Sequence, residues 1–137
     1  MYPEHLTTPM EKDLTDYGFR ALKSSEEVAQ LLDKKEGTTL VVVNSVCGCA
    51  AGNCRPGVKL AAQHAKTPDN MVTVFAGVDK GAVDAARGYM LPYPASSPSI
   101  GLFKDGQLIH FLERHHIEGN TAETIAANLK MAFDKFC

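Results

Sequence analysis

The stretch TLVVVNSVCGCAAGNC, residues 39–54, places three cysteines directly after a run of apolar residues. Residues 39–44 are apolar or β-branched at both odd and even positions, which is typical of a strand covered by helices on both faces of a parallel sheet. The alanine-rich residues 50–66 predict a helix, in which Pro56-Gly57 removes a backbone donor and predicts a kink. The cysteines are therefore expected where a central strand leads into a helix, the position at which open α/β sheets bind ligands.

The rest of the chain predicts alternating helices and strands. Thr8 to Glu11 and Ser24 to Glu27 have the pattern of capping boxes, so we expect an opening helix and a second helix over about 24–35. Asp79 and Asn120 are the expected caps of two further helices, the latter with Glu123 completing a capping box. Strands are expected at 19–22, 71–77, 99–104 and 107–113, the last two joined by a tight Asp105-Gly106 hairpin turn.

The order of these elements narrows the fold class. After the opening helix the chain reads β-α-β-α-β-α-β-β-α, with parallel βαβ units first and a hairpin plus helix last. This order predicts an α/β fold with a mixed central sheet, helices on both faces and an added N-terminal helix. Because the sequence has no repeats, low-complexity tracts or linkers, we expect one domain over residues 1–137.

Composition excludes several classes of protein. With 137 residues and 45% hydrophobic residues, the chain can bury a core without disulfide bonds. Its 14 basic and 16 acidic residues give a formal charge of −2, which suggests neither nucleic acid nor an anionic membrane as a partner. No apolar run approaches the roughly 20 residues of a membrane helix, and the first residues lack the order of a secretory signal. We therefore expect a cytoplasmic protein, in which clustered cysteines are typically catalytic or metal-binding.

The spacing of the cysteines favours redox chemistry. A thiol at a helix N-terminus has a pKa below the free value of about 8.5, because backbone N–H groups and the helix dipole stabilise the thiolate. Cys47 is therefore the better nucleophile. Extended residues i and i+2 lie about 6.6 Å apart, so the chain must turn for Cys49 to reach Cys47, and Gly48 is expected to permit that turn. Such a tight disulfide would be comparatively oxidising, which suits a bond that is formed and broken in each cycle.

Two other interpretations of the cysteines stay open on spacing alone. A free cysteine can pack as a small apolar residue, an interpretation that fits Cys54 best. Cys47, Cys49 and Cys54 could instead hold zinc or an iron–sulfur cluster, with His64 or Cys137 as the fourth ligand, although structural zinc sites usually contain C-x2-4-C pairs.

Other polar residues near these positions carry weaker signals. Arg55 could support a thiolate electrostatically, whereas Lys59 is expected on a solvated helix face. His115-His116 is expected to be a solvated turn pair. Ser97-Pro98 precedes a predicted strand and could hold a cis peptide bond, which spacing alone does not establish.

The sequence resembles the bacilliredoxins, thioredoxin-like proteins of bacillithiol-using bacteria. The stretches that carry the resemblance are 43–52 with Arg55-Pro56, 95–99, 102–106, 113–115 with 117–119, and the Tyr2-Pro3 start. The resemblance implies a thioredoxin-like fold in which Cys47 attacks, Cys49 resolves and a cis Pro98 faces them. Gly48, Ser97 and Pro98 are then expected to contact the substrate. Cys54 stands where the family usually has a small residue other than cysteine, which leaves open a bystander, a second resolving thiol or a metal ligand.

The resemblance also implies a function, a thiol–disulfide oxidoreductase that removes bacillithiol from modified proteins. Its partners would be S-bacillithiolated proteins and, as electron donor, a low-molecular-weight thiol or a disulfide reductase. Bacillithiol would be a co-substrate, and no metal or prosthetic group is expected. The alternatives are a general protein disulfide reductase or isomerase, a non-enzymatic metal-binding module and an interaction protein with inert cysteines.

Overall fold

The computed structural model describes residues 2–137 and contains one mixed five-stranded sheet. The strands are β1 (Arg20–Ala21), β2 (Thr38–Asn44), β3 (Asn70–Phe75), β4 (Ser99–Lys104) and β5 (Gln107–Leu112), in the order β1-β3-β2-β4-β5. β1 and β2 run parallel to β3, whereas β4 runs antiparallel to both β2 and β5. The mixed sheet predicted from the element order is therefore confirmed, with β2 at its centre.

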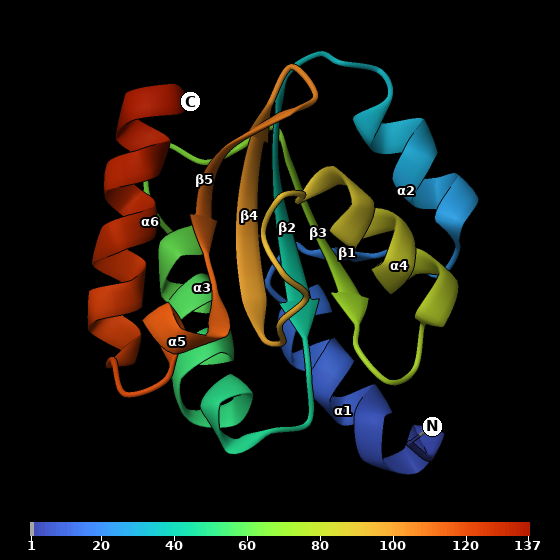
Figure 1. The fold of residues 1–137 in the computed structure, drawn as a ribbon. Helices are drawn as coiled ribbons and strands as arrows, with labels where there is room; N and C mark the ends of the chain where they lie inside the picture. Colours follow the sequence, from blue (N-terminus) through green and yellow to red (C-terminus); the bar gives the residue numbers. More distant parts are fainter. Residues whose placement is uncertain (1) are drawn as a thin grey trace.

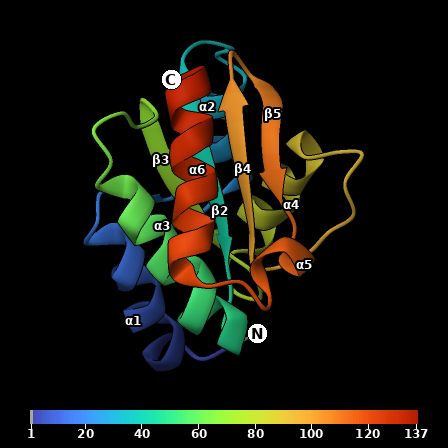
Figure 2. The same cartoon turned by 90° about the vertical axis from the view of Figure 1, so that its left-hand side faces the viewer.

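The helices form a layer on each face of this sheet. They are α1 (Glu4–Thr15), α2 (Ser25–Leu32), the π-helix η1 (Ala50–Cys54), α3 (Arg55–Ala62), α4 (Lys80–Tyr89), α5 (Arg114–Ile117) and α6 (Ala122–Phe136). α2 and α4 pack together on one face, and α3 and α6 pack together on the other (Figures 1 and 2). The added helix α1 lies at the end of the sheet toward which the arrowheads of β2 and β3 point (Figure 1).

The two-sided apolar pattern of β2 explains this layering. Leu40 and Val42 belong to the core cluster under α3 and α6, whereas Val41 and Val43 belong to the cluster under α2 and α4. Successive side chains of a strand point to opposite faces, so a strand buried on both sides must be apolar at every position. All seven residues of β2 are buried.

The predicted kink near Pro56 takes the form of a wide helical turn. Within η1 the backbone N–H of Arg55 donates to the carbonyl of Ala50, five residues earlier. Pro56 has no N–H to donate, and its ring would crowd the carbonyl four residues before it in a regular α-helix, which the wider π turn relieves. The helix expected over 50–66 therefore consists of η1 and α3, and it ends at Ala62.

The start of α1 differs from the prediction. The helix begins at Glu4 after an extended Pro3, whose carbonyl accepts hydrogen bonds from Leu6 N at 3.1 Å and Thr7 N at 3.3 Å. Pro9 lies inside the helix, so the cap predicted at Thr8 is wrong. Pro3 already supplies a fixed φ and the first helical acceptor, which allows the helix to start one turn earlier.

Other helix ends also depart from the predictions. Thr121, and not Asn120, caps α6 by accepting a hydrogen bond from Thr124 N, while Asn120 donates to the carbonyl of His116 at the end of α5. Asp79 precedes α4 as predicted, but its side chain accepts from Phe75 N and does not cap α4. Neighbouring polar residues have similar capping preferences, so local sequence does not decide between them. α2 follows its predicted Ser24 cap and ends at Leu32, earlier than expected.

The β4–β5 hairpin and the loop before β4 contain unusual backbone conformations. Asp105 and Gly106 have φ values of 53° and 83°, as the predicted two-residue turn requires. The Ser97-Pro98 peptide bond is cis, and so is Leu91-Pro92, which no sequence pattern predicted. Among residues 2–137, none of the helices is both long and apolar enough to cross a bilayer.

Gly57 is expected to be required where α3 packs on α6. A Cβ built on Gly57 lies 2.8 Å from Ile125 Cγ2, whereas one built on Gly88 in α4 meets no atom within 4 Å. We expect Gly57→Ala to lower the free energy of unfolding by about 1–3 kcal/mol through overpacking. The matched Gly88→Ala should raise it by about 0.5–1 kcal/mol through helix propensity. Urea unfolding of both variants tests this, and equal effects would contradict the packing argument.

Candidate active site

The CGC motif lies where β2 leads into the helical segment formed by η1 and α3. β2 ends at Asn44, and the chain is already helical at Gly48 and Cys49. The carbonyl of Cys47 accepts hydrogen bonds from Ala50 N at 3.1 Å and Ala51 N at 3.2 Å. Cys47 therefore lies at the N-terminal end of this segment, where unpaired backbone N–H groups favour a negative charge.

The two sulfurs of the motif are in direct contact. Cys47 Sγ and Cys49 Sγ lie 2.8 Å apart, both residues are partly buried, and both thiols are free. The hydroxyl of Ser45 donates to Cys47 Sγ at 3.2 Å. A thiolate at position 47 thus has a thiol and a hydroxyl as donors, an arrangement that suits a nucleophile with a resolving partner at hand.

The surroundings separate the acidities of the two thiols. Burial by itself raises the pKa of Cys47, but hydrogen bonds from the Cys49 thiol, the Ser45 hydroxyl and two backbone amides outweigh it, and the pKa falls below its ordinary value. Burial, together with the hydrogen bond and the negative charge of Cys47, raises the pKa of Cys49. The charge of Arg114 opposes this rise without cancelling it. Of the two thiols, Cys47 is therefore the one that ionises first as the pH rises, and Cys49 keeps its proton to a higher pH.

Gly48 permits the turn that brings the two cysteines together, as expected, but the turn does not require a glycine. The residue is exposed, its φ is not positive, and a Cβ added to it would meet no atom within 4 Å. The sulfurs approach each other because residues 48 and 49 are helical, a conformation that residues other than glycine also adopt. Residue 48 therefore allows the turn without using the conformational freedom that is special to glycine.

Arg55 stabilises the loop that precedes Cys47 and does not contact the sulfur. Its buried side chain donates from Nη1 to Asn44 Oδ1 at 3.0 Å and to the carbonyl of Ser45 at 2.8 Å. Asn44 Oδ1 also accepts from Ser45 N at 2.8 Å. Its donors point to the chain between β2 and Cys47, and electrostatic support of the thiolate by Arg55 stays a prediction. Arg55 thereby fixes the position of Ser45, whose hydroxyl donates to Cys47 Sγ.

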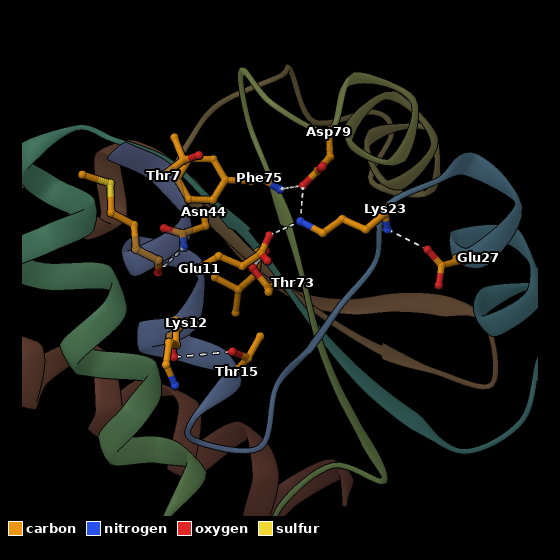
Figure 3. Close-up of polar contacts among 12 residues, drawn as sticks. Thr7, Glu11, Lys12, Thr15, Lys23, Glu27, Asn44, Thr73, Phe75 and Asp79 are labelled. Carbon is orange, nitrogen blue, oxygen red and sulfur yellow. Dashed lines mark hydrogen bonds and ion pairs between the residues drawn. The ribbon is translucent and has the colours of Figure 1, made fainter. Parts of the chain in front are cut away.

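The same residues connect the loop to α1. Asn44 donates from Nδ2 to the carbonyl of Met10 at 3.2 Å (Figure 3). Asp13 of α1 forms an ion pair with Arg55, whose Nε lies 3.5 Å from Oδ2, and accepts a hydrogen bond from Lys59 Nζ at 2.7 Å. Lys59 is therefore paired, and the expectation of a solvated helix face is wrong. The added N-terminal helix is part of the support of the candidate site.

A second polar cluster fixes α1 against β3. Lys23 Nζ contacts the carboxylate of Glu11 on α1 and lies 3.5 Å from Asp79 Oδ2, which also accepts from Phe75 N (Figure 3). The three charged groups join α1 to the segments that follow β1 and β3. This cluster positions α1 beside the carboxyl ends of β2 and β3 (Figure 1).

Among residues 2–137, the third cysteine and the proposed fourth ligands do not form a ligand cluster with the CGC pair. Cys54 is fully buried in the core under α3 and α6, and burial raises its pKa to about 12. Cys137 follows α6 and lies near Thr38, at the end of β2 opposite to Cys47. His64 Nε2 pairs with Asp134 Oδ1 at 2.8 Å. Cys54 is therefore a packing residue, and the metal site considered for the cysteines is not assembled.

One group of possible metal ligands exists among residues 2–137, and it is elsewhere. Glu113, His115 and His116 have ligand atoms within 4.8 Å of one another. His116 Nδ1 accepts from Glu113 N at 3.0 Å, and the Glu113 side chain accepts from the backbone of His116. These two side chains therefore cap the short helix α5. Both histidines are exposed as predicted, although they lie in a helical turn.

A hollow of about 220 Å³ opens beside Cys47. Its lining includes Tyr2, Ser45, Cys47, Gly77, Ser97 and Arg114. Ser99 is opposite Val43 in the β2–β4 register, which brings Ser97 and the buried Pro98 next to the chain that leaves β2. Ser97 thus lines the hollow as expected of a substrate contact, and the exposed Gly48 does not.

Sequence reasoning assigned no role to several residues of this site. Ser45, Tyr2 and Arg114 are in stretches that carry the family resemblance, but their proximity to Cys47 depends on tertiary structure. Arg114 donates from Nη1 to the carbonyl of Ser97 at 3.4 Å and from Nε to Glu118 Oε2 at 3.3 Å. The charges of Cys49 and Cys47 are close enough to raise the pKa of Arg114.

Ser45→Ala is expected to make Cys47 less reactive near neutral pH. The variant removes one donor to the thiolate, which raises the pKa of Cys47 toward that of an ordinary thiol. We expect the iodoacetamide rate of Cys47 at pH 7 to fall roughly threefold to tenfold, the loss of one hydrogen bond. At a pH above both pKa values the rates should converge. If the alkylation rate of Cys47 falls by the same factor at every pH, Ser45 controls access of the reagent to Cys47 and not ionisation of the thiol.

Comparison with known proteins agrees with this geometry. The family model described as Disulphide isomerase matches residues 2–137. A bacilliredoxin of Cytophaga hutchinsonii is 56% identical over 135 residues, 98% of this chain and 99% of the relative. Bacilliredoxins of Koribacter versatilis and Halalkalibacterium halodurans are 50% and 48% identical, over 100% and 99% of this chain and 94% of each relative.

Solved structures share the fold at low sequence identity. A putative oxidoreductase with a thioredoxin fold has a TM-score of 0.60 at 13% identity and covers 82% of this chain and 94% of that chain. Schistosoma mansoni thioredoxin has a TM-score of 0.60 at 19% identity and covers 88% and 97%. The predicted thioredoxin-like fold is confirmed. The full-length matches show that this chain belongs to the bacilliredoxin family of thiol–disulfide oxidoreductases.

Proposed function

We propose that this protein removes bacillithiol from S-bacillithiolated proteins, with Cys47 as the attacking and Cys49 as the resolving residue. The observation that carries the proposal is the 2.8 Å contact between two sulfurs of unlike acidity, the more acidic of which lines a hollow. The names of the relatives at 48–56% identity support bacillithiol as the thiol involved.

The reaction needs two exchanges. The Cys47 thiolate attacks the bacillithiol sulfur of the mixed disulfide, a bond forms between these sulfurs, and the protein thiol leaves as a thiolate that takes a proton from water. Cys49 then loses its proton and attacks Cys47 Sγ, which releases bacillithiol and leaves a Cys47–Cys49 disulfide. The substrate is reduced by two electrons, and the motif is oxidised by two.

A donor must return these electrons. Free bacillithiol or a disulfide reductase would reduce the Cys47–Cys49 disulfide, and two thiols would be oxidised for each cycle. We place the reaction in the cytoplasm, where reducing conditions favour the dithiol form. The mechanism uses no metal or prosthetic group.

The proposal is tested by trapping the first intermediate. Without Cys49, the bacillithiol captured by Cys47 cannot be expelled, so Cys49→Ala incubated with an S-bacillithiolated protein should gain the mass of one bacillithiol on Cys47. Peptide mapping by mass spectrometry locates it. Cys47→Ala in the same background is the control and should gain none. An unmodified Cys47, with the substrate still bacillithiolated, would contradict the proposal.

A general protein disulfide reductase or isomerase is the second candidate function. The description of the matched family model, Disulphide isomerase, favours it. The same two sulfurs would act on a less particular substrate. Rates with bacillithiol, glutathione and peptide mixed disulfides on one carrier protein separate the two functions, because only the first predicts a preference for bacillithiol.

A further inference from the structure

Arg114 brings a positive charge to the hollow beside the attacking sulfur. Among the residues that line the hollow in the described chain, 2–137, it is the only cation. It lies at the start of α5, immediately after β5, so a different part of the chain from the CGC motif supplies this charge. The charge of Arg114 acts to lower the pKa of Cys49, and the charges of both sulfurs raise the pKa of Arg114. The guanidinium therefore lies within electrostatic range of the reacting atoms.

The guanidinium is held in place and still has donors to offer. Nε donates to Glu118 and Nη1 to the carbonyl of Ser97, while the backbone N–H of Arg114 contacts Ser96 Oγ at 3.4 Å. A guanidinium has five N–H groups, and these contacts use two of them. Nη2 has no partner among residues 2–137 in this arrangement. A planar guanidinium with free donors suits a carboxylate, and its side chain is about half exposed, so a ligand can reach it.

The size of the hollow indicates what part of a substrate it takes. At about 220 Å³ it is smaller than the roughly 300–1,000 Å³ that hold a drug-sized ligand. A small thiol attached to a protein cysteine can enter it, whereas the folded protein that carries the thiol cannot. The sulfur that Cys47 attacks would then belong to the small thiol.

We propose that this hollow is a subsite for a low-molecular-weight thiol that bears a carboxylate, and that Arg114 binds this carboxylate. The inference rests on the proposed function, because it requires that Cys47 captures a small thiol. Bound in this way, the substrate presents its small-thiol sulfur to Cys47 and its protein sulfur to solvent. Arg114 is a specificity-determining residue in this account.

The charge of the captured thiol is tested with three symmetrical disulfides that contain no bacillithiol. Dithiodipropionate carries carboxylates, hydroxyethyl disulfide is neutral and cystamine is cationic. In each case the Cys47 thiolate forms a bond with one sulfur of the probe, the probe's S–S bond breaks, and the other half leaves as a thiolate that is protonated by water. The rate is measured by stopped-flow and mass spectrometry in a Cys49→Ser background, in which the reaction ends at the Cys47 mixed disulfide.

We expect Arg114→Gln to change the selectivity among the probes. The rate with dithiodipropionate relative to the neutral probe should fall roughly fivefold to tenfold at low salt, the loss of one exposed charge-assisted contact, and high salt should reduce this difference. The relative rate with cystamine should rise. Arg20→Gln, which removes an arginine paired with Glu27 at a distant edge strand, is the matched control and should change neither ratio.

The outcomes separate this inference from the proposed function. If Arg114→Gln changes the rate by the same factor with all three probes, the subsite is overturned, because Arg114 would then act only on the ionisation of Cys47 and Cys49. Unchanged ratios would overturn it as well, even if the trapping of bacillithiol on Cys47 succeeds. Failure of that trapping together with an Arg114-dependent preference for the anionic probe would overturn the choice of bacillithiol and support the carboxylate subsite.

Discussion

Replacement of Cys47 by serine is expected to abolish turnover of an S-bacillithiolated protein. An alcohol oxygen cannot form the disulfide that captures bacillithiol, so the remaining rate should be below about one thousandth of the wild-type rate. The measurement is release of bacillithiol from a labelled protein in the presence of excess reductant. The thermal transition should change little, because Cys47 is only partly buried and lines the hollow.

Cys54→Ala is the matched control for loss of a cysteine. Cys54 is fully buried, and its pKa of about 12 keeps it protonated at neutral pH. We expect turnover within about twofold of wild type and a loss of about 1 kcal/mol in the free energy of unfolding, a typical cost for a small core substitution. If Cys54→Ala instead loses turnover as Cys47→Ser does, Cys54 is a resolving thiol and the assignment of Cys49 is wrong.

Arg55→Met is expected to have the largest effect on stability among the polar residues of the site. The variant keeps most of the length of the side chain but leaves the buried Asn44 Oδ1 and the carbonyl of Ser45 without their charged donor. We expect a loss of about 2–4 kcal/mol in the free energy of unfolding, mainly from these two hydrogen bonds. The contact with Asp13 should contribute less, because that carboxylate is partly exposed.

Urea unfolding of Arg55→Met beside Arg20→Met measures this effect. Arg20 forms an exposed ion pair with Glu27, and its removal should change the free energy of unfolding by no more than about 0.5 kcal/mol. Arg55→Met should also slow alkylation of Cys47 at neutral pH, because Ser45 loses its support. Equal stability of the two variants would contradict the claim that Arg55 fixes the loop before Cys47.

The central fold was predictable because its signals are local. The apolar pattern of residues 39–44 reports burial on both faces, and Asp105-Gly106 supplies the backbone conformations that a two-residue hairpin requires. The helix ends were less predictable. Thr121 and Asn120 are both able to cap a helix. Thr121 caps α6 because the side chain of Asn120 donates to the carbonyl of His116 at the end of α5.

The support of the site depends on contacts between distant segments, which the sequence does not reveal. Arg55, Asp13 and Asn44 come from three separate elements, so the burial of Arg55 could not be read from its neighbours. Arg114 approaches the hollow only after β5 pairs with β4. Gly48 permits the expected turn between the cysteines, but its helical backbone is open to other residues as well, so the glycine itself says little about the geometry there. A single domain over residues 1–137 stays a prediction.

The ionisation of Cys47 is tested most directly by alkylation of each thiol as a function of pH, resolved by mass spectrometry. We predict that Cys47 is modified first, with a titration midpoint below that of an ordinary cysteine, that Cys49 follows only at a pH above it, and that Cys54 stays unmodified while the protein is folded. Modification of Cys49 before Cys47, or of both at the midpoint of an ordinary thiol, would contradict the account.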